Sequence, residues 1–318
     1  MNHNHGNKGE NMSNLTRCAC LGSLIFLNLA LGIQAAEPPK GFSVAGTAQG
    51  QNPLPSPRVD FSYAFGTPHR ITATMPDSSD KTLLDLQPDS LRMSWTYDDL
   101  KNLPLCVYRP TKATWELRML PKLDEQAFTH CTWHRLEGAL PVLDNVYESR
   151  DGTLRLQVAG GTTAAIVRVE MVNTGDREHR FSLPTTVRYL VSKDKQKQQI
   201  AWDRDTLKVG DRAMALVLGA DQCEVPETNT VVQVWKVQPG KRAVAWLVRP
   251  YRATLGDLAE LRRCDWASEF DAAVQTWKKL LGRAARFQVP DQGVQNAIHA
   301  CLADVFVMRE PLAKGYLG

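Results

Sequence analysis

The 318-residue sequence lacks the short motifs that mark several large enzyme classes. It has no G-x-x-x-x-G-K-[ST] loop, no G-x-G-x-x-G behind a strand, no G-x-S-x-G turn and no H-E-x-x-H pair. Nucleotide binding, serine-hydrolase chemistry and zinc-protease chemistry are therefore disfavoured. Strong charge is also missing, since the net charge is +4 and only "SKDKQKQQ" gathers several basic residues. The sequence gives no electrostatic footprint for nucleic acid.

No apolar run is long enough to cross a bilayer comfortably, which takes roughly 20 residues. The longest near the N-terminus, Leu21 to Ile33, follows Arg17 and precedes the small residues Ala35 and Ala36. A basic start, a short apolar run and small residues predict a signal peptide over residues 1–36. We expect export to the periplasm or outside the cell, with no stable membrane insertion after cleavage. The alternative is an N-terminal membrane anchor that is retained.

Cysteine is too sparse for a disulfide-stapled scaffold. Two of the seven cysteines, Cys18 and Cys20, lie in the expected signal peptide. An odd, widely spaced set of five then remains, so one disulfide, Cys106 to Cys131, is the pair to test. The alternative is that all five are small buried residues. These five are Cys106, Cys131, Cys223, Cys264 and Cys301.

From Val59 to about residue 252 the sequence alternates apolar and polar residues in short segments, which is typical of half-buried strands. Residues 37–58, rich in proline, glycine and serine, are expected to form an irregular leader. The clearest strands are "GTLRLQVA", "TTAAIVRVEMVN" and "HRFSLPTTVRYLV", joined by the turns "GG" and "NTGD". We expect an antiparallel meander, with the positive φ that glycine tolerates at the first turn and an edge or bulge at Pro184.

Further strands are expected at 213–220, 228–237 and 242–250, with no helix between them. This order predicts a mainly β fold, an antiparallel β-sandwich spanning 59–252. Residues 253–286 carry an apolar stripe at helical spacing and predict a linker helix. Residues 287–318 predict one further amphipathic helix, which Asp291 caps and Pro311 ends. Its stripe comprises Val294, Ile298, Cys301, Val305 and Met308.

The segment "HCTWH" holds a possible set of metal ligands, His130, Cys131 and His134. Zinc would need both histidine nitrogens within about 4 Å of each other, since each lies ~2.1 Å from the ion. The segment reads as a strand, in which two residues four apart are separated by roughly 13 Å. We therefore predict no metal site and no cofactor.

Acid–base and sugar-binding side chains are present, but the sequence does not pair them. A glycosidase needs two carboxylates across the scissile bond, roughly 5 to 9.5 Å apart. No two of the candidates can be paired, so the catalytic residues stay unknown; the candidates are Asp98, Asp99, Glu116, Glu137, Asp144, Glu148 and Asp151. Trp266 and Trp277 belong to the helix stripe. The other tryptophans could be core residues or, if exposed, could stack on sugar rings; they are Trp95, Trp115, Trp133, Trp202, Trp235 and Trp246.

The order of elements resembles the front of bacterial six-hairpin glycosidases, in which an N-terminal supersandwich precedes an (α/α)6 barrel. The resemblance covers about half of the chain, from Gly152 onward. It is carried by "TAAIVRVEMVNTGDREHRFSL", "VQPGKRAVAWLVRPY", "FDAAVQTWKKLL" and "VPDQGVQNAIHACLADVFVMRE". It implies that 287–318 is the first helix of a barrel that carries the catalytic carboxylates. No catalytic residue can therefore be transferred to this sequence.

Three hypotheses follow. The first is the non-catalytic N-terminal sandwich of a secreted glycoside hydrolase-like protein, truncated before its barrel, which acts on carbohydrate through the full-length protein. The second is a free-standing exported carbohydrate-binding sandwich with exposed strand tryptophans. The third is an enzyme whose site lies on the sandwich itself, as in a mutarotase-like fold, with histidine and carboxylates converging on one sheet.

Overall fold

A computed structural model describes residues 70–87, 89–95, 115–128, 130–189, 200–284, 288–309, 311–312 and 315–316. Several expectations lie outside these residues. They are the signal peptide at 1–36, the leader at 37–58, the start of the expected sandwich at 59–69, and the side chains of Asp98, Asp99 and Cys106.

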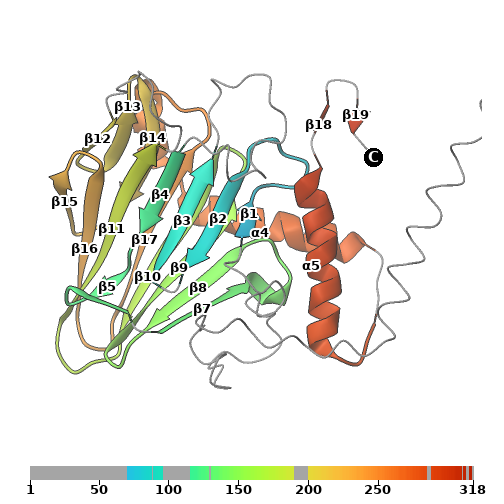
Figure 1. Cartoon of the computed structure of the whole chain (residues 1–318), viewed down its shortest axis with the longest axis horizontal. Helices are drawn as coiled ribbons and strands as arrows, with labels where there is room; N and C mark the ends of the chain where they lie inside the picture. Colours follow the sequence, from blue (N-terminus) through green and yellow to red (C-terminus); the bar gives the residue numbers. More distant parts are fainter. Residues whose placement is uncertain are drawn as a thin grey trace, which may run out of the picture. The chain divides into compact units, whose positions relative to one another are not determined.

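The described residues form a mainly β fold in which two antiparallel sheets are followed by helices, as the sequence predicts (Figure 1). The nine-stranded sheet contains β1 (Arg70–Ala73), β2 (Thr82–Gln87), β3 (Ser90–Trp95), β4 (Trp115–Met119), β11 (His179–Tyr189), β16 (Thr230–Val237) and β15 (Gln222–Glu227) in that order. β5 (Lys122–Leu123) also pairs with β11, and β6 (Gln126–Ala127) pairs with β5. The eight-stranded sheet contains β12 (Ile200–Asp203), β13 (Thr206–Val209), β14 (Arg212–Leu218), β17 (Arg242–Pro250), β10 (Ala164–Asn173), β9 (Gly152–Gly160), β8 (Leu143–Glu148) and β7 (His130–Arg135) in that order.

The main core fills the space between the two sheets. Alternate residues of each strand point into it because successive side chains of a strand face opposite ways. On β9 and β10 the inward residues are those that the alternation predicts, namely Leu154, Leu156, Val158, Val167, Val169 and Met171. The nine-stranded sheet supplies large side chains in return, among them Leu84, Met93, Leu117, Phe181 and Trp235. The described strands thus form a β-sandwich whose main core lies between the two sheets.

The expected three-strand meander is wrong in its third strand. β9 and β10 pair as a hairpin, but the other neighbour of β10 is β17. β11 instead joins the opposite sheet, where it pairs with β4, β5 and β16. The turn "NTGD" is therefore an arch from one sheet to the other. Alternation marks which side chains face inward but does not specify the partner of a strand, so the sequence could not distinguish the two arrangements.

Pro184 and Gly160 also have roles that differ from the expected ones. Pro184 lies in β11, inside the sheet, and its carbonyl accepts a bond from the Leu120 N–H at 2.9 Å. Proline has no backbone N–H and so cannot donate a hydrogen bond to the neighbouring strand. The missing bond falls at the break between β4 and β5, where the ladder is already interrupted. Gly160 does not have positive φ, but a Cβ there would lie 2.3 Å from backbone atoms of Thr74. The β9–β10 hairpin thus needs glycine for close backbone approach.

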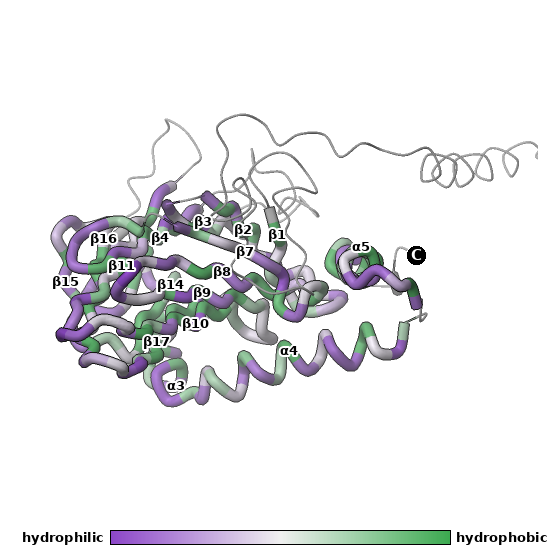
Figure 2. The backbone as a smooth tube through the Cα atoms, turned by 90° about the horizontal axis from the view of Figure 1, so that it is seen from below, coloured by the Kyte–Doolittle hydropathy of each residue, from purple (hydrophilic) through white to green (hydrophobic). Residues whose placement is uncertain are grey.

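The expected linker helix is broken into two pieces. The short η5 (Leu255–Asp257) leads into α3 (Leu258–Arg263), and α4 (Trp266–Arg283) follows. The break occurs because Asp265 acts as an N-cap, its side chain accepting a bond from the Ser268 N–H at 3.2 Å. α4 lies along the outer face of the eight-stranded sheet (Figure 2). Its predicted stripe is confirmed, with Trp266, Phe270, Val274 and Trp277 buried there.

The last helix, α5 (Gln292–Met308), begins at the predicted cap, where the Asp291 side chain accepts a bond from the Val294 N–H at 3.0 Å. It packs against α4 and the short η4 (Leu136–Gly138) that follows β7. A guanidinium from the sandwich, that of Arg135, pairs with Asp304 of α5. The helix faces the sandwich with residues of modest size, namely Asn296, Ala300, Ala303 and Val307. A two-residue strand pair follows, β18 (Pro311–Leu312) and β19 (Gly315–Tyr316).

Candidate functional site

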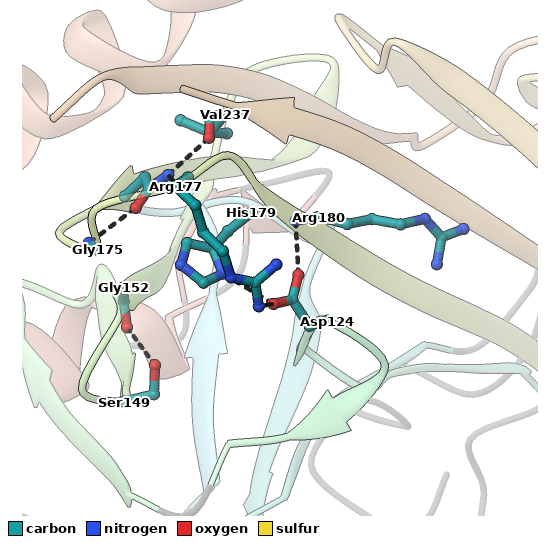
Figure 3. A network of polar contacts seen from close by, with 9 residues as sticks. Asp124, Ser149, Gly152, Gly175, Arg177, His179, Arg180 and Val237 are labelled. Carbon is teal, nitrogen blue, oxygen red and sulfur yellow. Dashed lines mark hydrogen bonds and ion pairs between the residues drawn. The ribbon is translucent and has the colours of Figure 1, made fainter. Parts of the chain in front are cut away.

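A network of polar side chains surrounds the arch between β10 and β11 (Figure 3). One carboxylate oxygen of Asp124 accepts a bond from Arg177 at 2.6 Å and lies 2.8 Å from Nδ1 of His179. Its other oxygen accepts the Arg180 backbone N–H at 2.9 Å. The Asn173 side chain donates to the Val237 carbonyl at 2.7 Å and accepts from the Gly175 N–H at 2.8 Å. The network therefore closes the arch and ties it to β16.

A histidine–carboxylate pair is also a common catalytic unit, but this one is built for structure. The His179 side chain is only 3% exposed, and a Cβ on Gly175 would lie 2.5 Å from its Nε2. No substrate can reach that nitrogen. Burial alone would raise the pKa of Asp124, but the bonds from Arg180 and His179 and the nearby positive charges lower it overall. The "NTGD…H" pattern in the glycosidase resemblance thus encodes a turn.

The possible metal ligands of "HCTWH" lie on a strand, β7, as predicted. His130 is exposed, while Cys131 and His134 are buried. The Cys131 thiol donates to the Asn145 side chain at 2.9 Å, and burial raises its pKa. No set of three or more His, Cys, Asp or Glu residues suited to a metal ion occurs in the described part of the chain.

The cysteines that the structure describes are free thiols, and they are not uniformly buried. Cys131 is buried, Cys223 and Cys264 are half-buried, and Cys301 is exposed on α5. The expectation of uniformly buried cysteines is therefore wrong for these four. The proposed partner of Cys131 in a disulfide, Cys106, lies outside the described residues.

Histidine and charged residues also come together on β7, β8 and β9 of the eight-stranded sheet, which bears on the mutarotase-like hypothesis. The strand register places His134 opposite Asp144. The Asp144 carboxylate accepts two bonds from Arg155, at 2.5 and 2.6 Å. His134 and Asp144 are fully buried, so a sugar cannot reach either side chain. We interpret this group as a buried ion pair that joins β8 and β9.

The other candidate carboxylates are dispersed. Glu116 is buried on β4 with Arg188 at 3.6 Å, and Glu137 in η4 pairs with Lys278 of α4. Glu148 ends β8, and Asp151 precedes β9 as the acceptor of the arch N–H groups through its backbone carbonyl. These four carboxylates lie on or beside different elements, and no contact among the described residues pairs any two of them across a cleft.

The strand tryptophans are core residues with one exception. Trp246 on β17 is half-buried and lies 6.1 Å from the Phe270 ring of α4. The remaining five are no more than 5% exposed, and they are Trp95, Trp115, Trp133, Trp202 and Trp235. These five tryptophan side chains are therefore too buried to stack on a sugar ring.

An apolar surface does lie open on α5. The stripe that the sequence singled out faces away from the sandwich: Val294 is 51% exposed, Val305 50% and Met308 56%. Cys301 is exposed between them. α5 therefore has two apolar faces, one docked on the sandwich and one uncovered. We call the uncovered face the α5 stripe; it comprises the exposed Val294, Cys301, Val305 and Met308 and the half-buried Ile298.

A cleft of about 740 Å³ opens where β17 runs into α3 and α4. Its walls are the loop Pro250–Ala253, the β9–β10 turn, and residues from Asp257 to Glu269. We call it the acidic cleft because four carboxylates line it against one guanidinium; these are Asp80, Asp257, Glu260, Glu269 and Arg252. The sequence did not reveal it, since its residues come from distant segments and no motif links them.

Among the described residues, no helix is long and apolar enough to cross a membrane.

No protein-family model matches the sequence, and no curated protein matches it. Among the solved structures that are weakly similar to this chain are two mannosidases. One is a family GH92 inverting mannosidase from Bacteroides thetaiotaomicron, with 10% identity, a TM-score of 0.31, and coverage of 77% of this chain and 38% of the mannosidase. The other is a family GH92 alpha-mannosidase from the same organism, with 8% identity, a TM-score of 0.25, and coverage of 73% and 38%. This chain thus spans well under half the length of either enzyme, and likeness at this level does not establish a shared fold.

Proposed function

We propose that this chain is the sandwich portion of an exported glycoside hydrolase-like protein, and that its α5 stripe packs against a helical barrel in cis. The observation that carries the proposal is the pair of apolar faces on α5. One face is occupied by the sandwich, and the other is open at Val294, Val305 and Met308. The sequence from Gly152 onward resembles six-hairpin glycosidases, and this resemblance suggests that the partner is a helical barrel.

The open face has a measurable energetic consequence. Complete burial of a Val or Met side chain is worth roughly 1.5 to 3 kcal/mol, so covering a side chain that is half exposed is worth about 1 kcal/mol. Val294, Val305 and Met308 together therefore favour a helical partner by about 3 kcal/mol. Another helix, which can present a complementary apolar stripe, is the natural partner for a helix surface of this shape.

In this proposal the sandwich is not the catalytic part. The His179–Asp124 pair closes a turn, and Asp144 is clamped by Arg155 out of reach of a substrate. Catalytic carboxylates would then come from the barrel, and the sandwich would help to shape its carbohydrate cleft. We further propose export, with cleavage after Ala36, to the periplasm or the extracellular space.

The central test is association with a helical domain encoded downstream of, or beside, this reading frame. We expect the two to co-purify, and the triple variant Val294→Lys, Val305→Lys and Met308→Lys to weaken the association at least tenfold. Val225→Lys is the matched control, since this valine is 38% exposed but lies on β15. Equal binding by the triple variant, or equal loss in the control, would remove the α5 stripe from the interface.

Catalysis and export are tested separately. The purified chain should release no reducing sugar from a panel of glycans, and release that a carboxylate substitution in this chain abolishes would overturn the non-catalytic role. N-terminal sequencing of the exported protein should begin at Glu37. A mature protein that starts upstream of this residue would contradict the cleavage site.

A further inference from the structure

We propose that the acidic cleft binds a small organic cation, meaning a protonated amine on an apolar body. The inference does not depend on the glycoside hydrolase proposal, because the cleft is formed by β17, the β9–β10 turn, and the α3–α4 junction. Neither the α5 stripe nor a barrel contributes to it. Its volume of about 740 Å³ falls in the range typical of small-molecule sites, about 300 to 1,000 Å³.

The charges in the cleft do not balance. Arg252 is used by Asp80, with its Nη2 lying 3.1 and 3.4 Å from the two carboxylate oxygens. Asp257 is used locally, since its carboxylate accepts the Thr254 N–H at 2.8 Å and the Thr254 hydroxyl at 2.9 Å. Glu260 and Glu269 have no such side-chain partner within the described ranges. Two carboxylates are thus left to attract a cation.

Cys264 lies in the same cleft as the two carboxylates and is affected by their charge. The half-buried thiol lies in the cleft wall between α3 and α4. Burial raises its pKa, and the negative charges of Glu269, Asp265 and Glu260 raise it further. Glu260 of α3 and Glu269 of α4 line the same cleft as Cys264, so a cation bound in the cleft would experience the negative charge of both helices.

The walls of the cleft are apolar enough for the body of such a ligand, and they include one hydroxyl group that has no hydrogen-bond partner among the described residues. Pro250, Leu261 and Trp266 contribute apolar surface. Tyr251 also lines the cleft, is only 8% exposed, and its hydroxyl has no hydrogen-bond partner in the described part of the protein. A buried hydroxyl without a partner is costly, so a ligand that supplies a hydrogen bond there would gain affinity.

The test uses two probes of nearly the same shape, benzylamine, which is protonated at neutral pH, and benzyl alcohol, which is neutral. Isothermal titration of the full chain should show saturable binding of benzylamine at least tenfold tighter than benzyl alcohol. Affinity for benzylamine should fall as salt is raised, since the partly exposed carboxylates are screened.

The double variant Glu260→Gln and Glu269→Gln should lose roughly tenfold or more in affinity for benzylamine and keep its weak affinity for benzyl alcohol. Asp176→Asn is the matched control, because Asp176 is an exposed carboxylate beyond the far end of β10, roughly 30 Å from the cleft. Near-ultraviolet circular dichroism verifies that each variant is folded. Equal affinity for the two probes, no effect of the double variant, or the same loss in the control would overturn the proposal.

Discussion

The ion pair between Arg135 and Asp304 should hold α5 on the sandwich, and its contribution can be estimated from burial. The Arg135 side chain is 4% exposed and the Asp304 side chain 44%. Breaking a fully buried pair costs about 3 to 5 kcal/mol, whereas exposed pairs contribute about 0 to 1 kcal/mol. This pair is buried on one side only, so we expect a coupling energy of about 1 to 2 kcal/mol.

A double-mutant cycle measures that coupling directly. The variants are Arg135→Met, Asp304→Asn and their combination, each unfolded in urea. Asp304→Asn should destabilise the chain because it removes the carboxylate from a guanidinium that stays buried, while Arg135→Met removes the buried charge as well. Hydrogen exchange of the α5 amides should quicken in Asp304→Asn and change little in the sandwich strands.

The control cycle uses Lys208 and Asp203, an ion pair whose side chains are 32% and 58% exposed, so that neither is buried as Arg135 is. Its coupling energy should be smaller than that of Arg135 and Asp304. If the two cycles give the same coupling, or if α5 exchange is unchanged in Asp304→Asn, then the ion pair does not fix the helix and the docking must rest on apolar contacts alone.

Three further outcomes can be measured on the same chain. Gly160→Ala should lower the free energy of unfolding by roughly 1 to 3 kcal/mol or more, because its Cβ would meet backbone atoms at 2.3 Å, whereas Gly282→Ala in open space on α4 should be neutral or stabilising in urea titrations. Asp124→Asn should lose stability near pH 7; because the folded-state pKa of Asp124 is lowered, the difference from wild type should vanish as the pH falls through and below the usual aspartate range, ~3.9. A thiol reagent should label Cys301 in the native state and leave Cys131, whose pKa burial raises, unlabelled until unfolding, as mass spectrometry would show.

The candidate sites show which structural features can be predicted from residue type and spacing alone. The strand reading of "HCTWH" was correct because the two-residue period and the distance between strand residues are local properties. Burial was harder to foresee. The same alternation permits a strand tryptophan to face the core or the solvent, and the five buried ones became core residues once a second sheet covered them.

The acidic cleft and the His179–Asp124 pair cannot be predicted from the sequence, because their members are far apart in the chain. Asp80 reaches Arg252, and Asp124 reaches His179, only when separate strands are placed side by side. Neither pair has a fixed spacing in the sequence that could have identified it.

The sequence by itself determined the mainly β fold, the positions of several strands (β7, β9, β10, β11, β14, β16 and β17), the stripe of α4, and the N-cap of α5 at Asp291. These features follow from periods of 2 and 3.6 residues and from capping chemistry, which involve near neighbours only. Tertiary structure alone decided that β11 crosses to the second sheet, and which face of α5 docks. Both depend on partners that are distant in the chain. An apolar side-chain pattern shows that a face can be buried, but it does not specify which element covers that face.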